Sequence, residues 1–272
     1  MSQTFPPPPK SRLARDLTFG PGGASTIPKL IYGTAWKKEE TWRFVHKALR
    51  AGFRGLDTAG QSGHYDEQAV AVGLREACEG GFVNSEDIFV QSKINPPSLN
   101  PDDWPEGERA LSWVDRVHQC IGPSIELRRI ASRKYIDSYL LHTPMSTVED
   151  TLKVWQVMSS YVPEYIGHLG ISNVSLDFLT SFYEQAHPKP SFVQNRFYRD
   201  TRYEVELRKF CRERGVVFQS FWTLTANRHL LKSRPVVDVA EKMGMSKVVA
   251  LYALVLGLGG YRYWTGRRAR SI

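Results

Sequence analysis

Residues 136–161 read IDSYLLHTPMSTVEDTLKVWQVMSSY, in which a short apolar run is followed by a longer amphipathic stretch. The apolar run predicts a buried strand over residues 136–142, and the later apolar spacing predicts a helix over residues 147–161. Only a few residues connect the two. This strand–loop–helix unit is the repeating feature of the chain.

The same unit recurs on both sides of this stretch. Further strands are predicted at 30–33, 54–57, 88–93, 166–172, 192–195 and 216–221, and further helices at 39–51, 66–79, 110–134, 176–186, 201–214, 235–242 and 246–256. Ser175 is the expected N-cap of the helix at 176–186. Strands that alternate with helices through short connections predict a parallel sheet covered by helices.

Seven such units favour an α/β fold of the (β/α)8 TIM barrel type over an open doubly wound sheet. The 272 residues suffice for one barrel of roughly 250 residues. An open dinucleotide-binding sheet would carry a glycine-rich turn after its first strand, whereas Gly20-Pro21-Gly22-Gly23 precedes that strand. We expect one barrel domain over residues 27–260, preceded by a disordered Pro-rich leader over residues 1–26.

Composition limits the class of protein. Hydrophobic content of 42% and charged content of 24% are ordinary for a globular protein. No apolar run approaches the roughly 18 residues that a membrane-spanning helix needs, and no signal peptide is present. Three widely separated cysteines predict buried thiols, a reducing, cytoplasmic location and no metal site: Cys78, Cys120 and Cys211.

The net charge of +8 raises the possibility of nucleic-acid binding. Half of it comes from four arginines in the last eleven residues, Arg262, Arg267, Arg268 and Arg270. No nucleic-acid-binding motif accompanies the charge, and a protein that binds a dinucleotide phosphate can carry the remainder. We expect no nucleic-acid partner.

Three of the predicted strands end in a polar residue, and a tyrosine follows in a loop. Asp57, Lys93 and His142 close the strands, and Tyr65 lies after Asp57. Reactive side chains in parallel barrels gather where strands end and loops begin. Taken singly, the aspartate, histidine and tyrosine also suit capping or packing roles. A lysine ending a buried strand needs a partner, which Asp57 would supply.

Together these four residues suit proton delivery to a carbonyl oxygen. Tyrosine is a weak acid, with a reference pKa of roughly 10. The Lys93 cation would favour the phenolate and make Tyr65 a better donor, while Asp57 holds the lysine and His142 orients the carbonyl. The hydride would have to come from a cofactor.

Several short segments closely resemble the aldo-keto reductases between about residues 27 and 259. The matching segments are Gly33-Thr34-Ala35-Trp36, Leu56-Asp57-Thr58-Ala59, His64-Tyr65-Asp66-Glu67, Ser92-Lys93, Leu141-His142, Gly170-Ile171-Ser172-Asn173 and Gln194-Asn195. The resemblance implies a (β/α)8 barrel that uses NADP(H), with Asp57, Tyr65, Lys93 and His142 as the catalytic tetrad.

The resemblance also implies a cofactor site. Ser172, Asn173 and Gln194 would hold the nicotinamide carboxamide, and Phe221 would stack on its ring. Backbone groups at Trp222 and Leu224 would approach the pyrophosphate, and Thr34 and Ala35 would border the cofactor. Trp36, Trp222 and residues 96–104 would line an apolar substrate pocket.

Two features depart from the family's pattern. Many members have the tyrosine five residues after the aspartate, where this chain has Ser62, and Tyr65 instead follows a longer loop, as in a fungal subset. Residues 261–272 replace the family's eighth strand, its adenosine-phosphate segment and its last helices with a basic tail that has neither strand nor helix pattern. We therefore expect the eighth strand and C-terminal helices to be missing or altered.

Back-translation suggests an origin for this tail. In a shifted frame from the end of Gly260, the possible codons permit Val-Pro-Val-Leu-Asp-Gly-Thr-Thr-Ser-Glu-Glu-His, which resembles the missing segment. We hypothesise a frameshift or misplaced splice junction. An intact transcript that matches the tail across Gly260 would contradict this.

The sequence thus predicts a monomeric enzyme that reduces an aldehyde or ketone with NADPH. The expected substrate is a small-molecule carbonyl compound with a bulky or aromatic group, and the resemblance suggests fungal secondary metabolism. The alternative is a catalytically impaired barrel, lacking part of the cofactor site, that acts as a binding or regulatory protein or reflects a faulty gene model. Cofactor affinity distinguishes the two.

Overall fold

The computed structural model describes residues 17–19, 25–98, 100–258 and 264–265. Its strands are β1 (Leu17–Phe19), β2 (Ser25–Ile27), β3 (Tyr32–Gly33), β4 (Gly55–Asp57), β5 (Phe89–Ile94), β6 (Ile136–Leu141), β7 (Ile166–Ser172), β8 (Phe192–Arg196), β9 (Val217–Phe221) and β10 (Trp264–Thr265). The predicted strands between residues 30 and 221 are confirmed, with ends that differ by at most two residues.

The main helices are α1 (Thr41–Arg50), α2 (Glu67–Glu79), α3 (Trp113–Ile130), α4 (Val148–Ser159), α5 (Leu176–Gln185), α6 (Val205–Glu213), α7 (Arg234–Met243) and α8 (Lys247–Gly257). Ser175 caps α5 as predicted, because its side chain accepts from the backbone N–H of Phe178. Helix α6 begins later than predicted, since Arg202, Tyr203 and Glu204 adopt positive φ angles before it. No described helix is long and apolar enough to cross a membrane.

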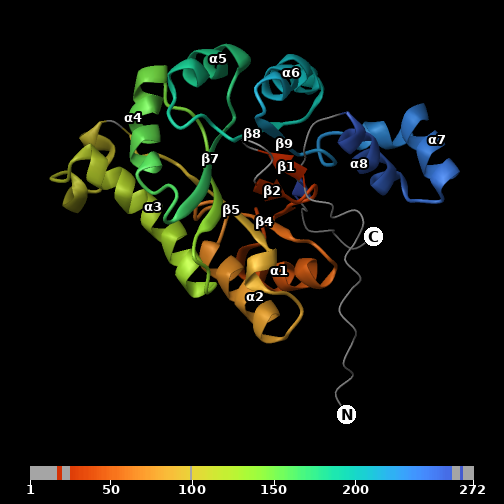
Figure 1. Ribbon diagram of the computed structural model, residues 1–272, viewed down its shortest axis with the longest axis horizontal. Coiled ribbons are helices and arrows are strands. Elements are labelled where there is room, and N and C mark those ends of the chain that lie inside the picture. The colour runs from red at the N-terminus through yellow and green to blue at the C-terminus, as the bar shows by residue number, and fades with distance from the viewer. Residues whose placement is uncertain (1–16, 20–24, 99, 259–263, 266–272) are drawn as a thin grey trace.

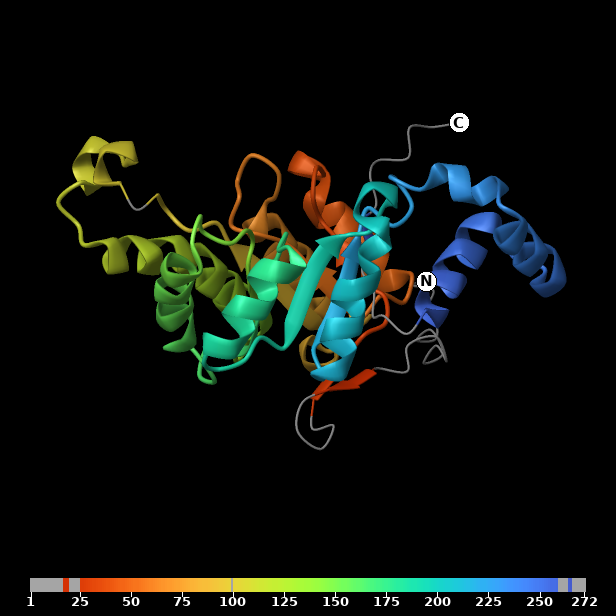
Figure 2. The same ribbon diagram turned by 90° about the horizontal axis from the view of Figure 1, so that it is seen from above.

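Eight strands form one curled parallel sheet in the order β10-β3-β4-β5-β6-β7-β8-β9. Figure 1 shows α1 to α6 following one another around the outside of these strands. The predicted α/β barrel is therefore confirmed. Figure 2 shows α7 and α8, in blue, as a pair at the end of the molecule opposite α3.

The eighth strand position is altered rather than vacant. Trp264 and Thr265 pair in parallel with Tyr32 and Gly33, so the expectation of an altered eighth strand is confirmed, although the tail's sequence carries no strand pattern. Strand pairing uses backbone N–H and C=O groups that every non-proline residue carries, so an atypical sequence can still add to a sheet edge. Among the described residues no ladder joins β10 to β9. Residues 261–263 and 266–272 lie outside the described part.

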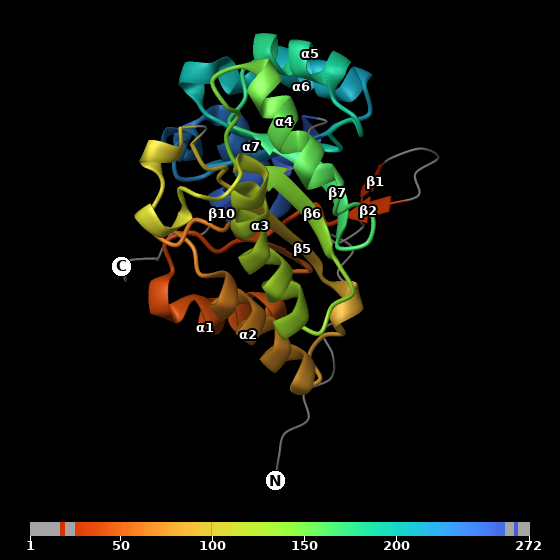
Figure 3. The same cartoon turned by 90° about the vertical axis from the view of Figure 1, so that its left-hand side faces the viewer.

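A short hairpin corrects part of the predicted disordered leader. Strands β1 and β2 pair antiparallel, and Phe19 and Ile27 are buried. They pack against Phe89, Phe192 and Val217, which begin β5, β8 and β9, so the hairpin covers the amino-terminal end of the barrel (Figure 3). Burial of these two apolar side chains explains why the strands form. Residues 1–16 and 20–24 lie outside the described part.

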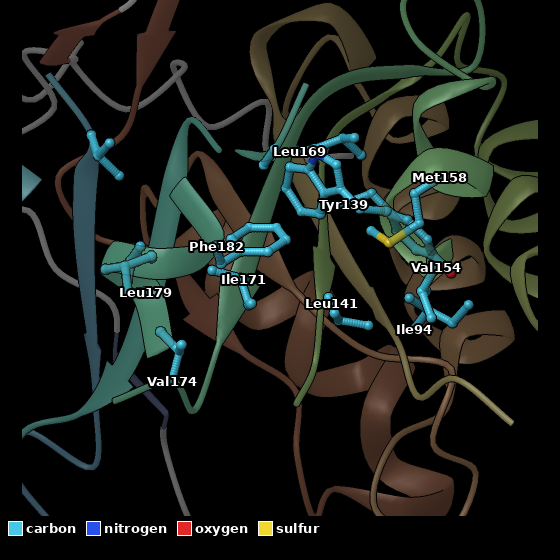
Figure 4. Close-up of a cluster of buried hydrophobic side chains, with 14 of the residues drawn as sticks. Ile94, Tyr139, Leu141, Val154, Met158, Leu169, Ile171, Val174, Leu179 and Phe182 are labelled. Carbon is cyan, nitrogen blue, oxygen red and sulfur yellow. The ribbon is translucent and has the colours of Figure 1, made fainter. Parts of the chain in front are cut away.

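The largest apolar core lies between the sheet and helices α3 to α6. Figure 4 shows Tyr139, Leu141, Leu169 and Ile171 from β6 and β7 meeting side chains of the flanking helices, among them Val154, Met158, Leu179 and Phe182. The side chains that the strands and the helices contribute to this core are apolar, as expected where helices cover a parallel sheet. It fixes the strands whose carboxyl ends carry the polar residues described next.

Candidate active site

The carboxyl ends of β4, β5 and β6 bring the four predicted catalytic residues together. Lys93 Nζ donates to Asp57 Oδ2 at 2.5 Å and to the backbone oxygen of Thr58 at 2.8 Å. The same ammonium lies 5.2 Å from the centre of the Tyr65 ring. That ring meets the His142 ring edge-on, with 6.1 Å between centres. Asp57 ends β4 and His142 directly follows β6, while Tyr65 enters from the β4–α2 loop.

The loop that carries Tyr65 is held by local hydrogen bonds. The backbone N–H of Tyr65 donates to the oxygen of Gln61, and the oxygen of His64 accepts from the N–H of Trp36. Asp66 then caps α2 by accepting from the N–H of Ala69 at 2.8 Å. The longer loop therefore still delivers a tyrosine to the strand ends, and Tyr65 rather than Ser62 faces Lys93 and His142.

The Tyr65 phenol differs from the sequence expectation. Burial raises the pKa of Tyr65 far above its usual range, and the negative charge of Asp57 raises it further. We expected the Lys93 cation to lower this pKa. Desolvation and the Asp57 carboxylate instead determine the direction of the shift. Tyr65 is therefore fully protonated at neutral pH.

The lysine–aspartate pair is deeply buried, with side-chain exposures of 1% for Lys93 and 0% for Asp57. Burial lowers the pKa of Lys93, and the carboxylates of Asp57 and Glu67 act in the opposite direction. Such a pair is costly to desolvate and persists only when its geometry is satisfied. Here the ammonium has both a carboxylate and a carbonyl oxygen as acceptors.

His142 is held in its neutral form. Burial lowers its pKa to about 3, helped by the positive charge of Lys93 and by His64. Its Nδ1 atom is buried and has no hydrogen-bond partner among the described residues. A neutral imidazole can donate one hydrogen bond and accept another, so it can polarise a carbonyl without carrying charge.

Glu67 is a buried acid within a matching segment, but the sequence pattern predicted no role for it. Its Oε1 accepts from the hydroxyls of Ser92 at 2.5 Å and Ser124 at 2.7 Å. Burial raises the pKa of Glu67, while these two hydrogen bonds and the charge of Lys93 oppose the rise. Its position two residues after Tyr65 is a pattern that could have drawn attention to it.

Two inward-facing glutamines were also missed. Gln91 in β5 donates to Asp57 Oδ1 at 2.6 Å, and Gln219 in β9 bonds to Gln91 across the barrel. The sequence does contain a hint, because Phe89-Val90-Gln91, Phe192-Val193-Gln194 and Val217-Phe218-Gln219 each place a glutamine third in a strand. An uncharged polar residue in an apolar strand calls for a partner.

The predicted carboxamide-binding residues lie beside the tetrad. Asn173 Nδ2 donates to the backbone oxygen of His142 at 2.9 Å, and the Ser172 hydroxyl donates to the backbone oxygen of Gln194 at 2.6 Å. Gln194 Nε2 donates to Gln219 at 2.9 Å and lies 3.3 Å from Asp57 Oδ1. Ser172 ends β7, Asn173 directly follows it, and Gln194 lies in the middle of the neighbouring β8.

The other predicted cofactor residues occupy more varied positions. Thr34 is fully buried, and both its N–H and its hydroxyl bond to the oxygen of Asp57, so it fixes the end of β4. Ala35 is buried beside it. Phe221 ends β9, Trp222 has a φ of 59° with the Arg196 guanidinium 4.0 Å from its ring centre, and Leu224 packs against the α7–α8 pair.

A cavity of about 650 Å³ borders the tyrosine, and its lining includes Lys38, Ser62, His64, Tyr65 and Pro123. Trp36, expected in an apolar substrate pocket, is 48% exposed, and its ring contacts that of His64 at a tilt of 43° with ring centres 3.9 Å apart. Trp104, expected there too, is buried within its own loop and donates to the backbone oxygen of Ser98. The described surroundings of Tyr65 are thus more polar than the sequence suggested.

Comparisons with known proteins show the family to which the chain belongs. The aldo/keto reductase family model matches residues 23–239. An NAD(P)H-dependent 6'-deoxychalcone synthase from Glycine max is 27% identical over 234 residues, which cover 77% of this chain and 67% of the relative. An aldehyde reductase from Saccharomyces cerevisiae is 25% identical over 258 residues, covering 82% and 73%. The chain spans 63% to 67% of the length of the first relatives.

Solved structures show the same fold. An aldo-keto reductase from Bombyx mori in complex with NADP superposes with a TM-score of 0.74 at 20% identity, covering 94% of this chain and 84% of that one. An aldo/keto reductase from Brucella melitensis gives 0.72 at 20% identity, covering 93% and 88%. Because the family model matches most of the sequence and the barrel carries the expected residues at its strand ends, this chain belongs to the aldo/keto reductase family.

Proposed function

We propose that this protein reduces an aldehyde or ketone to an alcohol with NADPH. The observation that carries the proposal is the convergence of a protonated tyrosine, a buried lysine–aspartate pair and a neutral histidine at the carboxyl ends of β4 to β6. The cavity of about 650 Å³ borders this group at Tyr65, and its lining includes neither Lys93 nor His142.

Tyr65 is the proposed proton donor. Its raised pKa keeps the phenol protonated until a carbonyl oxygen beside it gains negative charge. As that oxygen becomes an alkoxide, the proton moves to it and the alcohol forms. The phenolate left behind faces the Lys93 ammonium, which stabilises the new charge.

Asp57 and His142 prepare this transfer. Asp57 fixes Lys93 through a 2.5 Å hydrogen bond, so the ammonium does not need to move during the reaction. His142 contributes a neutral imidazole whose ring stands edge-on to Tyr65, and it would orient the carbonyl oxygen toward the phenol. The side chains can thus act without any change of charge before substrate binds.

The residues around the tetrad fit a nicotinamide. Gln194 has its amide nitrogen committed to Gln219, which leaves Oε1 to accept from a carboxamide N–H. Asn173 likewise has Nδ2 committed, and its Oδ1 can accept. Bound NADPH would supply the hydride for the carbonyl carbon. The relatives support this choice, because one is named NAD(P)H-dependent and another was solved in complex with NADP.

A buried cation supports an anionic ligand on the same side of the barrel. Lys37 lies four residues beyond the end of β3 and is 2% exposed. Its Nζ lies 5.8 Å from the ring centres of Tyr32 and Phe44 and has no hydrogen-bond partner among the described residues. Burial lowers its pKa to about 8. A phosphate group of the cofactor would give this ammonium a partner.

The test combines NADPH titration by fluorescence with carbonyl reduction measured as loss of NADPH absorbance, over a panel of aliphatic and aromatic aldehydes and ketones. Tyr65→Phe is the matched variant, because it removes only the hydroxyl. We expect the unsubstituted chain to bind NADPH and reduce members of the panel, and Tyr65→Phe to bind NADPH equally but lose turnover by at least roughly a hundredfold. Binding without turnover by either chain would instead support a binding protein, and absence of NADPH binding would overturn the proposal.

A further inference from the structure

A layer of buried amides crosses the barrel beneath the candidate tetrad. It consists of Gln91 on β5, Gln194 on β8 and Gln219 on β9, with Asp57 on β4 completing the layer. All four side chains are at most 2% exposed. Asp57 lies opposite Gln91 in the β4–β5 register, and Gln194 lies opposite Gln219 in the β8–β9 register. The layer therefore joins two strand pairs on opposite sides of the barrel.

The hydrogen bonds within this layer have a direction. Gln91 and Gln219 form a reciprocal amide pair, in which Gln91 Nε2 donates at 2.8 Å and Gln219 Nε2 donates back at 2.9 Å. Gln219 Oε1 also accepts from Gln194 Nε2 at 2.9 Å. The second donor bonds of Gln91 and Gln194 reach Asp57 Oδ1, at 2.6 and 3.3 Å. Every described donor bond thus ends on another amide or on the carboxylate.

This arrangement fixes which oxygen of Asp57 faces the lysine. A carboxylate only accepts hydrogen bonds, so both amide nitrogens must turn toward it. With Oδ1 occupied by amide donors, Oδ2 is left for Lys93 Nζ at 2.5 Å. The amides carry no charge, so they orient the carboxylate without competing with the ammonium for it.

We propose that Gln91 and Gln219 are positioning residues that align Asp57, and through it Lys93, and that Gln219 links this pair to the cofactor-binding Gln194. The inference rests on the proposed function and extends it. Gln219 does not bond to Asp57 itself. It acts by holding the amides of Gln91 and Gln194 in the orientation that the carboxylate requires.

Two substitutions separate the parts of the network. Gln91→Met removes the shorter donor bond to Asp57 at nearly constant volume, and Gln219→Met removes the bridge to Gln194 as well. Ser138→Ala is the matched control, because Ser138 is fully buried, lies opposite Gln91 in the β5–β6 register, and has no hydrogen-bond partner among the described residues.

We expect both glutamine variants to lower kcat by about tenfold or more, since misalignment of a charged partner weakens transition-state stabilisation. Only Gln219→Met should also weaken NADPH binding, because only it releases Gln194. The control should change neither quantity. A purely structural role would lower the thermal midpoint without this split between kcat and NADPH affinity. Unchanged kcat in both folded variants would overturn the proposal.

Crystal structures of the variants give a reading that does not depend on turnover. We expect the Asp57 carboxylate to rotate and its Oδ2 to move away from Lys93 Nζ in Gln91→Met, but not in Ser138→Ala. An unmoved carboxylate would refute the proposal that the glutamines align Asp57. This result would hold even if the unsubstituted chain proved inactive and the proposed reductase function had failed. If neither variant folds, side-chain amide NMR of the unsubstituted chain tests the connection from Gln219 through Gln194 to the cofactor. We expect the Gln219 amide resonances to shift when NADPH is added. Unchanged resonances would refute that connection.

Discussion

Replacing Lys93 with methionine should destabilise the protein far more than loss of an ordinary ion pair. Lys93 is 1% exposed, and its ammonium is 2.5 Å from an equally buried carboxylate. Lys93→Met keeps the length of the side chain but removes the charge. Asp57 is then left as a buried anion that accepts from the uncharged amides of Gln91 and Gln194 but has lost its ammonium partner.

The size of the effect follows from the burial. Removing one partner of a buried ion pair costs about 3–5 kcal/mol, whereas an exposed pair contributes about 0–1 kcal/mol. For a domain of this length each kcal/mol lowers Tm by roughly 2–4 °C. Lys93→Met should therefore lower Tm by about 6–20 °C. The loss of about 3–5 kcal/mol is a large fraction of the roughly 5–15 kcal/mol by which such domains are stable.

The double variant Asp57→Asn with Lys93→Met provides the decisive comparison. It removes both charges and leaves a neutral amide against an apolar chain, so much of the lost stability should return. Urea unfolding at neutral pH of the unsubstituted chain, both single variants and the double variant gives the coupling free energy. The reasoning is refuted if Lys93→Met costs less than about 1 kcal/mol, or if the double variant is no more stable than Lys93→Met.

Three further results are expected. Glu67→Gln should leave Tm unchanged near pH 4 and raise it increasingly at higher pH. The pKa of Glu67 is raised in the folded protein, so above the ordinary glutamate pKa of about 4.3 the unfolded chain loses this proton more readily and the native state is destabilised. A difference in Tm that does not depend on pH would contradict this. The imidazole NMR resonances of His142 should stay constant from pH 8 to 5, because burial lowers its pKa to about 3. The free energy of unfolding should fall as the pH drops from about 6.5 toward 3, since the unfolded chain binds the proton first. A titration midpoint of His142 near pH 6.5 in the folded protein would contradict the burial argument. Gly73→Ala would bring a Cβ within 2.5 Å of the Trp42 oxygen between α1 and α2 and should cost roughly 1–3 kcal/mol in urea unfolding, whereas Gly122→Ala, where a Cβ meets nothing within 4 Å, should cost nothing.

Much of the fold could be predicted from local patterns. Strands such as β7 and helices such as α5 carry their own apolar periodicity and cap, so their positions follow from neighbouring residues alone. The strand-end positions of Asp57, Lys93 and His142 followed from the same reasoning. Tyr65 was a candidate because it follows Asp57 in a loop, but the loop sequence alone does not specify that its ring lies beside Lys93 and His142.

Other features required the assembled barrel. The hairpin of β1 and β2 forms because Phe19 and Ile27 find apolar partners at the start of strands far away in the sequence. The strand at Trp264–Thr265 depends on the open edge of β3, which no local pattern of the tail reveals. In both cases the stabilising partner is far away in the sequence, so a pattern of neighbouring residues does not reveal it.

The sequence by itself determined the order of strands and helices, the family resemblance and the set of polar residues at the strand ends. Only the tertiary structure decided how those residues are charged and what holds them. The raised pKa of Tyr65 and the lowered pKa of His142 follow from desolvation, which depends on the packing of the whole barrel. The bond between Gln91 and Gln219 likewise exists only because the curling of the sheet brings residues 128 positions apart within 2.9 Å.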